Sequence, residues 1–217
     1  LEKAKILDEK LKRGEKLVIA LGGNSLIKKG EKPTISNQFK NAKKTMESII
    51  PLIKNKHKIV ITHGNGFQVG NILIRVEESL GKAYSIPLEV CVAESQGEIG
   101  YMIEQSLQNT LVKHKLNIPV VSILTQVVVD KKDPAFKNPT KPIGPFYTKA
   151  QAQKLTKSGF KLVEQIGRGW RKVVASPKPK SIDDIKTIEL LLKHKTIVIA
   201  AGGGGVPIIK EKKKITH

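Results

Sequence analysis

Three short glycine-rich turns are the segments of this sequence best suited to hold an anion. Glycine has no Cβ, so a backbone N–H in such a turn can approach an anion closely, and glycine adopts positive φ readily. A helix that begins after the turn adds the partial positive charge of its N-terminus. The expected chemistry is therefore the binding of a phosphate-bearing ligand. The turns are GGN (22–24), HGNG (63–66) and GGGG (202–205).

Each turn follows an apolar run, and a glycine after a strand is often only a tight turn. The prediction of a phosphate site therefore depends on all three turns occurring together. None of them matches the P-loop pattern, and none gives the dinucleotide fingerprint with its downstream acidic partner. A phosphate site of another design is expected. For Asn24 a second interpretation stays open, because its side chain could cap a following helix.

Four apolar runs are too short for helices and predict buried strands. Apolar residues between them recur at helical spacing, as in the segment 36–50, where Ser36 is the expected N-cap. Strands that are apolar on both faces and alternate with amphipathic helices indicate a parallel sheet covered by helices, so the fold class is α/β. The carboxyl ends of parallel strands share one edge, which would bring the turns together. The expected strands are 16–21, 58–62, 119–124 and 196–201, and the expected helices are 1–14, 36–50, 88–112, 149–157 and 183–193, with one more after Gly66.

Residues 126–180 break this alternation with a dense set of Pro, Gly and Lys. They predict an inserted lid subdomain that contains a hairpin and one helix. The main lobe then consists of residues 1–125 and 181–217. We expect this lobe to carry the phosphate site and the lid to close over it.

A few other side chains could do chemistry. Trp170 with Arg168 and Arg171 could stack on a nucleotide, although packing within the lid is the preferred interpretation. Asp183 and Asp184 are expected to lie at a helix N-terminus rather than on a metal. No metal site is predicted from the protein side chains.

Composition limits the classes of partner. The formal net charge is +20, from 39 Lys and Arg against 19 Asp and Glu, and such a balance attracts anions. The lysines are scattered and aromatic residues make up only 4%, so a lysine-rich solvated surface is preferred to a nucleic-acid interface. No apolar run is long enough to span a membrane, and no membrane partner is expected. The single cysteine, Cys91, favours a reducing compartment and is expected to be a small buried side chain.

Seven segments carry a resemblance to a known family: VIALGGNSL (18–26), THGNGFQVG (62–70), SQGEIGYM (95–102), TQVVVD (125–130), DPAFKNPTKPIGPFYT (133–148), GRGWRKVVASPKP (167–179) and AAGGGGVPII (200–209). They resemble the carbamate kinases, a family of the amino-acid kinase superfamily. The stretch 133–148 is the most specific, because it is similar to the lid that distinguishes carbamate kinases within the superfamily. The resemblance implies a three-layer αβα sandwich with a mainly parallel sheet and an inserted lid. Two residues depart from the family pattern: Phe67 stands where proline is usual, and Glu94 where a small or thioether side chain is usual.

The resemblance implies reversible phosphoryl transfer between carbamoyl phosphate and ADP, giving ATP and carbamate, with Mg²⁺ as a cofactor. Such a transfer needs in-line placement and positive charge around the phosphoryl oxygens. Lys141, flanked by Pro139 and Pro142, is expected to move in with the lid and neutralise the phosphate. Because a carbamate oxygen is already anionic, no base is needed, and His63 is expected to be structural.

The glycine turns receive roles from the same resemblance. The first turn would face the phosphoryl group, the second would hold the carbamoyl group, and the third would contact the nucleotide. The expected catalytic residues are Lys141, Gly22 and Asn24; the expected substrate-binding residues are Gly22, Gly23, Asn24, Gly64, Asn65, Gly66 and Lys141; the expected nucleotide-binding residues are Gly203 and Gly204.

In this family the chain continues beyond the third glycine turn into a lobe that holds the nucleotide. That lobe is expected to be absent here, since the sequence ends at His217, and the 217-residue chain alone is expected to be inactive. The family also implies a cytoplasmic homodimer that acts in arginine metabolism. Two alternatives stay open: a non-catalytic paralogue that binds carbamoyl phosphate or only dimerises, and a basic nucleic-acid binder, which the retained lid and turns disfavour.

Overall fold

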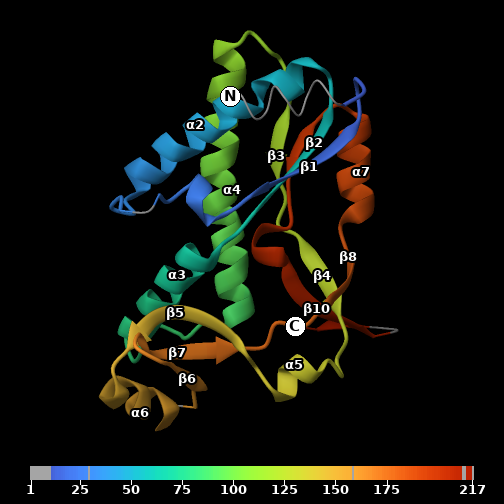
Figure 1. Cartoon of the computed structure of the whole chain (residues 1–217). Helices are drawn as coiled ribbons and strands as arrows, with labels where there is room; N and C mark the ends of the chain where they lie inside the picture. The colour runs from blue at the N-terminus through green and yellow to red at the C-terminus, as the bar shows by residue number, and fades with distance from the viewer. Residues whose placement is uncertain (1–10, 29, 158, 212–213, 217) are drawn as a thin grey trace.

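A parallel sheet forms the centre of the computed structural model, which describes residues 11–28, 30–157, 159–211 and 214–216. The four strands follow the order β1-β2-β9-β3, and every neighbouring pair is parallel (Figure 1). The prediction of a parallel sheet is confirmed. The third and fourth expected strands are shorter than predicted, and residues 1–10 of the helix expected at 1–14 lie outside the described residues. The strands are β1 (Lys16–Leu21), β2 (Lys58–His63), β3 (Val120–Ser122) and β9 (Ile197–Ile199).

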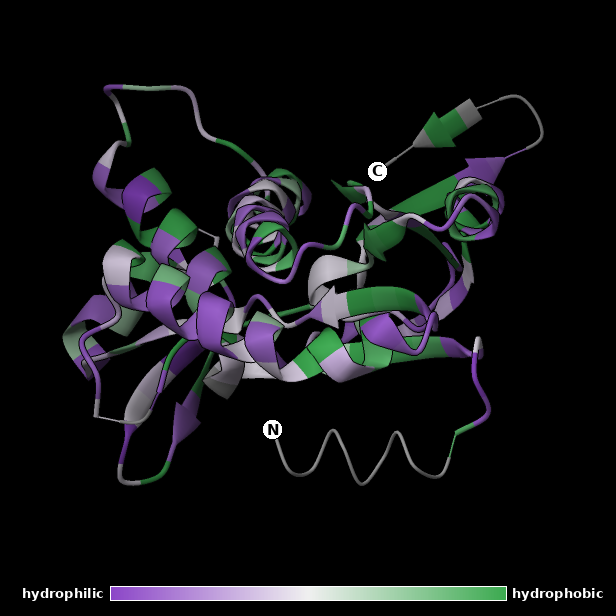
Figure 2. Cartoon of the chain, turned by 90° about the horizontal axis from the view of Figure 1, so that it is seen from above, coloured by the Kyte–Doolittle hydropathy of each residue, from purple (hydrophilic) through white to green (hydrophobic). Residues whose placement is uncertain are grey.

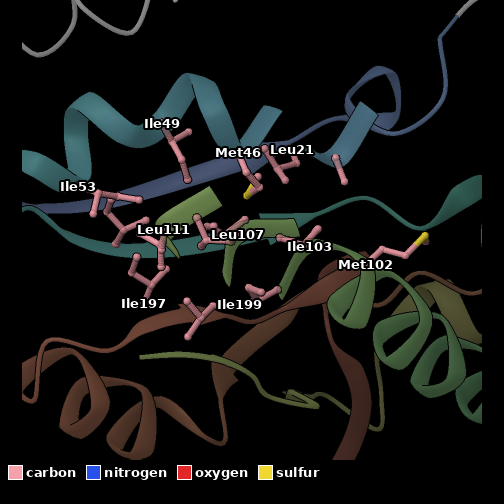
Figure 3. Close-up of a cluster of buried hydrophobic side chains, with 14 of the residues drawn as sticks. Leu21, Met46, Ile49, Ile53, Met102, Ile103, Leu107, Leu111, Ile197 and Ile199 are labelled. Carbon is pink, nitrogen blue, oxygen red and sulfur yellow. The ribbon is translucent and has the colours of Figure 1, made fainter. Parts of the chain in front are cut away.

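Successive strand residues point to opposite faces of this sheet, and helices pack on both faces. The prediction of a buried strand at 16–21 holds for one face only, because Lys16, Val18 and Ala20 of β1 are exposed. Ile59 and Ile61 of β2 pack into a large apolar cluster with α2 (Ile35–Lys54) and α4 (Leu88–Lys113). Val60, between them, packs on the opposite face with α7 (Ile185–Lys193). The three-layer α/β sandwich is thus confirmed. Side chains from both helices and from the strands meet in the large cluster, as Figure 3 shows for Met46, Ile53, Leu107 and Ile199.

The start of α2 differs from the prediction. The N-cap is Thr34, whose Oγ1 accepts a hydrogen bond from the backbone N–H of Asn37 at 3.2 Å. Ser36 lies inside the helix, so its assignment as the cap is wrong. The helix begins earlier because Thr34 keeps extended backbone angles directly after Pro33, as an N-cap requires.

A second sheet, in the order β11-β10-β4-β8, continues from the third glycine turn. In it β10 pairs parallel with β4, whereas β11 and β8 pair antiparallel with their neighbours. Both ends of the segment 126–180 therefore belong to a sheet that also contains the strand after the third turn. The strands are β4 (Gln126–Val129), β8 (Pro179–Ile182), β10 (Val206–Glu211) and β11 (Lys214–Thr216).

The middle of that segment forms an antiparallel sheet in the order β5-β7-β6. We call residues 141–174 the three-stranded subdomain. It includes α6, which confirms the helix expected at 149–157, and the short helix α5 leads into it. Whether the whole segment 126–180 moves as a lid stays a prediction. The elements are α5 (Pro134–Lys137), β5 (Lys141–Tyr147), α6 (Lys149–Lys157), β6 (Leu162–Gln165) and β7 (Gly169–Val174).

The remaining helix, α3 (Gly66–Glu78), starts at the second turn and packs against α4 and β5. Cys91 of α4 is fully buried beside Val69 and Ile72 of α3, as expected for a small apolar side chain. Burial raises the pKa of its thiol. Figure 2 shows hydrophilic positions mainly on the outer faces of the helices and hydrophobic positions along the strands between them. Among the helices in the described ranges, none is long and apolar enough to cross a bilayer.

Candidate functional site

The three glycine turns follow neighbouring strands and lie at one edge of the central sheet. The backbone N–H of Gly64 donates to the carbonyl oxygen of Leu21 at 3.0 Å, which joins the second turn to the end of β1. The backbone N–H of Ala200, just before the third turn, donates to Ile61 of β2 at 2.9 Å. The sheet order therefore places the second turn between the first and the third.

The glycines of the third turn are required by close packing as well as by backbone angle. A Cβ on Gly202 would overlap the ring of His63, and a Cβ on Gly203 would overlap the side-chain amide of Asn65. Gly203 also has a φ of +65°, in the left-handed region that glycine adopts readily. The third turn thus packs directly against the second. Its glycines are needed for this close packing as well as for the change in chain direction.

Asn65 has a fixed side-chain orientation. Its Nδ2 donates to the hydroxyl oxygen of Ser95 at 2.9 Å, and that hydroxyl donates to the carbonyl of Val92 at 2.6 Å. Because the only proton of the Ser95 hydroxyl is already used, Ser95 can only accept from Asn65. The amide nitrogen of Asn65 therefore faces Ser95, and Oδ1 is left as the acceptor of this buried side chain.

Asn65 is also the N-cap residue of α3, but its side chain makes no capping hydrogen bond. Its side chain is turned toward Ser95 instead, so Oδ1 does not accept from the first N–H groups of α3. These groups and the helix dipole make the start of α3 a favourable place for an anion. The residue that begins the helix, Gly66, is exposed.

Two polar residues that the sequence analysis missed hold the third turn in place. The side chain of Gln96 accepts from the backbone N–H of Thr125 at 2.8 Å and donates to its carbonyl at 3.2 Å. The hydroxyl oxygen of Thr125 then accepts from the backbone N–H of Ala201 at 2.8 Å. Both residues lie in segments that carry the family resemblance, SQGEIGYM and TQVVVD. Their residue types alone, however, did not predict the hydrogen bonds between Gln96 and Thr125.

A pocket of about 530 Å³ brings parts of the predicted site together. A cavity of this size suits a small ligand. From the predicted residues, its wall contains Asn65 and Gly66 of the second turn, Gly203 and Gly204 of the third, and Lys141 of β5.

The first turn does not contribute to this wall. Gly22 and Gly23 are exposed beside the second turn, and Gly64 is likewise exposed and outside the wall. The backbone of Asn24 lies in a short 3-10 helix, Gly23–Ser25, whose N-cap is Gly22. Because α2 begins only at Ile35, the alternative in which Asn24 caps that helix is wrong.

Two cationic side chains line the pocket. Lys141 is exposed, and its ammonium group has no ion-pair partner within the described part of the chain. Arg171 of β7, for which packing within the lid was the preferred interpretation, also lines the pocket; its Nε donates to the carbonyl of Gly144 at 2.9 Å. Arg168 and Arg171 both lie over the ring of Phe146, at 5.2 and 5.3 Å from its centre, so they also pack within the three-stranded subdomain.

His63 is buried at the end of β2, and its Nδ1 lies 3.1 Å from the carbonyl oxygen of Gly64. A carbonyl oxygen only accepts, so the proton of the neutral ring is on Nδ1. Burial lowers the pKa of His63, which keeps the ring uncharged. These features suit a side chain that supports the two turns.

The acidic residues near the second sheet make structural contacts. Asp184 is the residue before α7, and its carboxylate accepts from the backbone N–H of Gln126 at 3.0 Å. Asp183 pairs with Lys210. Among the residues that the structure describes, no three His, Cys, Asp or Glu side chains are grouped so as to hold a metal ion. The pocket therefore offers no side-chain cluster that fits Mg²⁺.

Comparison with known proteins decides the family. No protein-family model matches the chain. A carbamate kinase of Pyrococcus horikoshii is 50% identical over 204 residues, which cover 93% of this chain and 65% of that protein. The structure of carbamate kinase from Giardia lamblia bound to AMP-PNP superposes with a TM-score of 0.86 at 40% identity, over 95% of this chain and 66% of that one. A second Giardia lamblia carbamate kinase structure, thiocarbamoylated by disulfiram, also has a TM-score of 0.86, at 41% identity, over 94% of this chain and 67% of that one.

The chain belongs to the carbamate kinase family. It spans about 65% of the length of the curated carbamate kinases that it matches. The amino-acid kinase fold that the resemblance implied is confirmed with it.

The two departures from the carbamate kinase pattern lie at positions that tolerate them. Glu94 is exposed on α4, so its carboxylate needs no buried partner. Phe67 is 38% exposed in the first turn of α3, where proline or another residue can stand, because the N–H groups of a first helical turn have no intrahelical partner.

Proposed function

We propose that this protein acts as a carbamate kinase and catalyses reversible phosphoryl transfer between carbamoyl phosphate and ADP, giving ATP and carbamate. The family supports this proposal. The single observation that carries it is the pocket whose wall combines the exposed Lys141 with the second and third glycine turns. A cation opposite backbone amides is the arrangement that an acyl phosphate needs.

In this reaction the bond between phosphorus and the carbamoyl oxygen breaks, and a bond forms between phosphorus and a terminal oxygen of ADP. Carbamate leaves with the electron pair and needs no proton. The protein therefore has to place the two oxygens in line and stabilise negative charge on the phosphoryl oxygens. Lys141 and Arg171 supply positive charge at the pocket, and the N-terminus of α3 adds its dipole.

The fixed orientation of Asn65 suggests how the carbamoyl group is distinguished. Its Oδ1 is an acceptor, because the amide nitrogen is bonded to Ser95. The amino group of carbamoyl phosphate is a donor, so we assign Asn65 to this group, together with Gly64 and Gly66 of the same turn. Backbone amides at Gly22, Gly23 and Asn24 then face the phosphoryl group from the neighbouring strand end. Gly203 and Gly204 face the nucleotide.

The nucleotide pair is ADP and ATP, and Mg²⁺ is the expected cofactor. Mg²⁺ is commonly held in part by substrate phosphates, where it neutralises their charge. The described residues provide no carboxylate cluster at the pocket, so Mg²⁺ would be held there mainly by the substrate phosphates and water. The cytoplasm, which holds ADP and ATP, is the proposed place of action.

A homodimer is the proposed assembly. The most exposed large apolar side chains of α4, together with one beside β3, could be covered in this way, and β3 is the last strand of the central sheet on that side. They are Tyr101, Val112 and Leu124, with 57%, 77% and 52% of their surface exposed. A second copy of the chain would cover them.

The test is an assay for ATP and for ligand binding on the same samples. The 217-residue chain is incubated with carbamoyl phosphate, ADP and Mg²⁺, with the full-length Pyrococcus horikoshii carbamate kinase as a positive control. ATP formation that Lys141→Met abolishes would support the enzyme. Binding of carbamoyl phosphate without ATP formation is the result expected of the 217-residue chain alone and would support the acyl-phosphate site, whereas the absence of both would overturn the proposal.

A further inference from the structure

Glu77, near the C-terminal end of α3, carries a buried ion pair with Lys172 of β7. Only 4% of the Lys172 side chain and 17% of the Glu77 side chain are exposed. The same carboxylate accepts a hydrogen bond from the hydroxyl of Tyr147, at 3.2 Å from Oε2. One carboxylate on α3 therefore binds two residues of the three-stranded subdomain.

The rest of the Lys172 environment comes from the subdomain itself. The ammonium lies 3.6 Å from the centre of the Phe160 ring and 5.8 Å from the centre of the Tyr147 ring. Burial and the neighbouring charge of Glu77 raise the pKa of Tyr147, so this phenol stays protonated and remains a donor. Within the described residues, Glu77 is the one acidic group that pairs with Lys172.

Two of the residues joined by this carboxylate lie at the far ends of elements that begin at the pocket: Glu77 near the end of α3 and Tyr147 at the end of β5, whereas Lys172 of β7 pairs in register with Ile143 of β5. Helix α3 starts with Gly66 and strand β5 starts with Lys141, and both residues line the pocket. Halfway along, a Cβ on Gly70 would lie 3.4 Å from Cα of Gly144, so helix and strand approach closely there. Figure 1 shows α3 and β5 side by side.

We propose that Glu77, Lys172 and Tyr147 form a latch that holds the three-stranded subdomain on α3 and thereby positions Lys141 at the pocket. Separating the two bodies would leave a buried ammonium without its partner, which is costly. A latch of this kind limits how far β5 can move along α3. It therefore fixes the position of Lys141, the first residue of β5. The role of Lys141 itself rests on the proposed function, whereas the attachment of the subdomain does not.

Attachment is tested by a distance measurement on the 217-residue chain. Trp170 of β7 is the only tryptophan, so it serves as the energy donor to a dye on Lys43→Cys of α2. We expect Glu77→Gln and Lys172→Met each to lower energy transfer, and to raise the rate of tryptic cleavage in the subdomain by at least about 10-fold. The matched control is Lys180→Gln, which removes the exposed ion pair of Lys180 with Asp130 and should change neither quantity.

Two further variants keep the test decisive. Tyr147→Phe removes one hydrogen bond and should give a smaller change in the same direction, even if the charge variants fold poorly. Exchanging the charges in Glu77→Lys/Lys172→Glu should restore part of the energy transfer. Transfer and cleavage rates equal to those of the wild type in folded Glu77→Gln and Tyr147→Phe proteins would overturn the latch.

Positioning of Lys141 is tested with carbamoyl phosphate as the probe. If the latch acts through Lys141, the loss of affinity in Glu77→Gln/Lys141→Met should equal that in Lys141→Met alone, since effects that share one path are not additive. Additive losses would overturn the positioning role. A wild-type chain that binds no carbamoyl phosphate while the latch variants still loosen the subdomain would refute the proposed function and leave the latch standing.

Discussion

The side-chain nitrogen of Asn65 donates to the hydroxyl oxygen of Ser95 across 2.9 Å, from the start of α3 to the buried side of α4. Helix α4 therefore sets the orientation of the second glycine turn. Because Asn65 lines the pocket, the contact reaches the ligand site although Ser95 itself is fully buried. This relationship leads to the first prediction.

Replacing Ser95→Ala should weaken carbamoyl phosphate binding by roughly 5-fold, because the Asn65 amide loses the acceptor that fixes its orientation, a contact worth about 1 kcal/mol. The dissociation constant is measured by titration, and the melting temperature is recorded beside it. Ser106→Ala, at a second buried serine of α4, is the matched control. Equal affinity in the Ser95→Ala and wild-type chains would show that Asn65 does not need this partner.

Lys141→Met should weaken binding of carbamoyl phosphate by about 10- to 100-fold, since a charge-assisted hydrogen bond to the ligand is lost. Stability should change little, because the side chain is exposed. Lys137→Met, on the neighbouring helix α5, removes an equal charge outside the pocket wall. If the two variants lose affinity to the same extent, the effect comes from net charge and not from Lys141.

Gly203→Ala should lower the free energy of unfolding by about 1–3 kcal/mol, because the new methyl group overlaps the Asn65 side chain at a positive φ. Urea unfolding at equilibrium measures this change. Gly97→Ala is the comparison: it lies in α4 with nothing within 4 Å of the added Cβ, and alanine suits a helix interior. A Gly203→Ala chain as stable as Gly97→Ala would contradict the packing of the third turn on the second.

His63 should make the protein less stable as the solution becomes acidic. Burial lowers its folded-state pKa below the ordinary histidine value of about 6.5, so below that value the unfolded chain binds a proton that the folded chain excludes. The loss of stability begins as the pH falls through the unfolded pKa and grows until the folded pKa is reached. Carboxylates such as Glu47, whose pKa is lowered by Lys113 and His114, contribute only at lower pH.

His63→Asn keeps an N–H donor near the carbonyl of Gly64 but cannot titrate. Between about pH 7.5 and pH 5.5 the wild type should lose more unfolding free energy than this variant. Urea unfolding across this range provides the comparison. Parallel curves would mean that His63 is protonated in the folded chain as readily as in the unfolded one.

The sequence was enough to predict the parallel sheet and the edge at which its turns lie, because both depend on local signals. Short apolar runs that end in glycine identify strands such as β1 and β2 whatever their neighbours are. Which turns share a pocket depends on strand order instead. Since β9 pairs with β2 from more than a hundred residues away, the third turn rests on Asn65, and the first turn stays outside the pocket wall.

The sequence also could not predict which residues far apart in the chain contact each other. Lys172 is one of many lysines, and nothing near it in the chain marks it as buried; its partner Glu77 lies 95 positions away. Likewise, the sequence did not indicate that β4 pairs with β10. Because of this pairing, the two ends of the segment 126–180 belong to the second sheet and not to the sheet of the three-stranded subdomain. The cap of α2 was missed for a local reason, because Thr34 and Ser36 are both good caps and only backbone geometry chooses between them.

The space beside Gly203 is filled by the Asn65 side chain, which leaves no room for a Cβ at this position. The same backbone leads within a few residues into β10 and so into a different sheet. The short segment that carries Gly203 therefore connects the Asn65 side of the pocket to the second sheet.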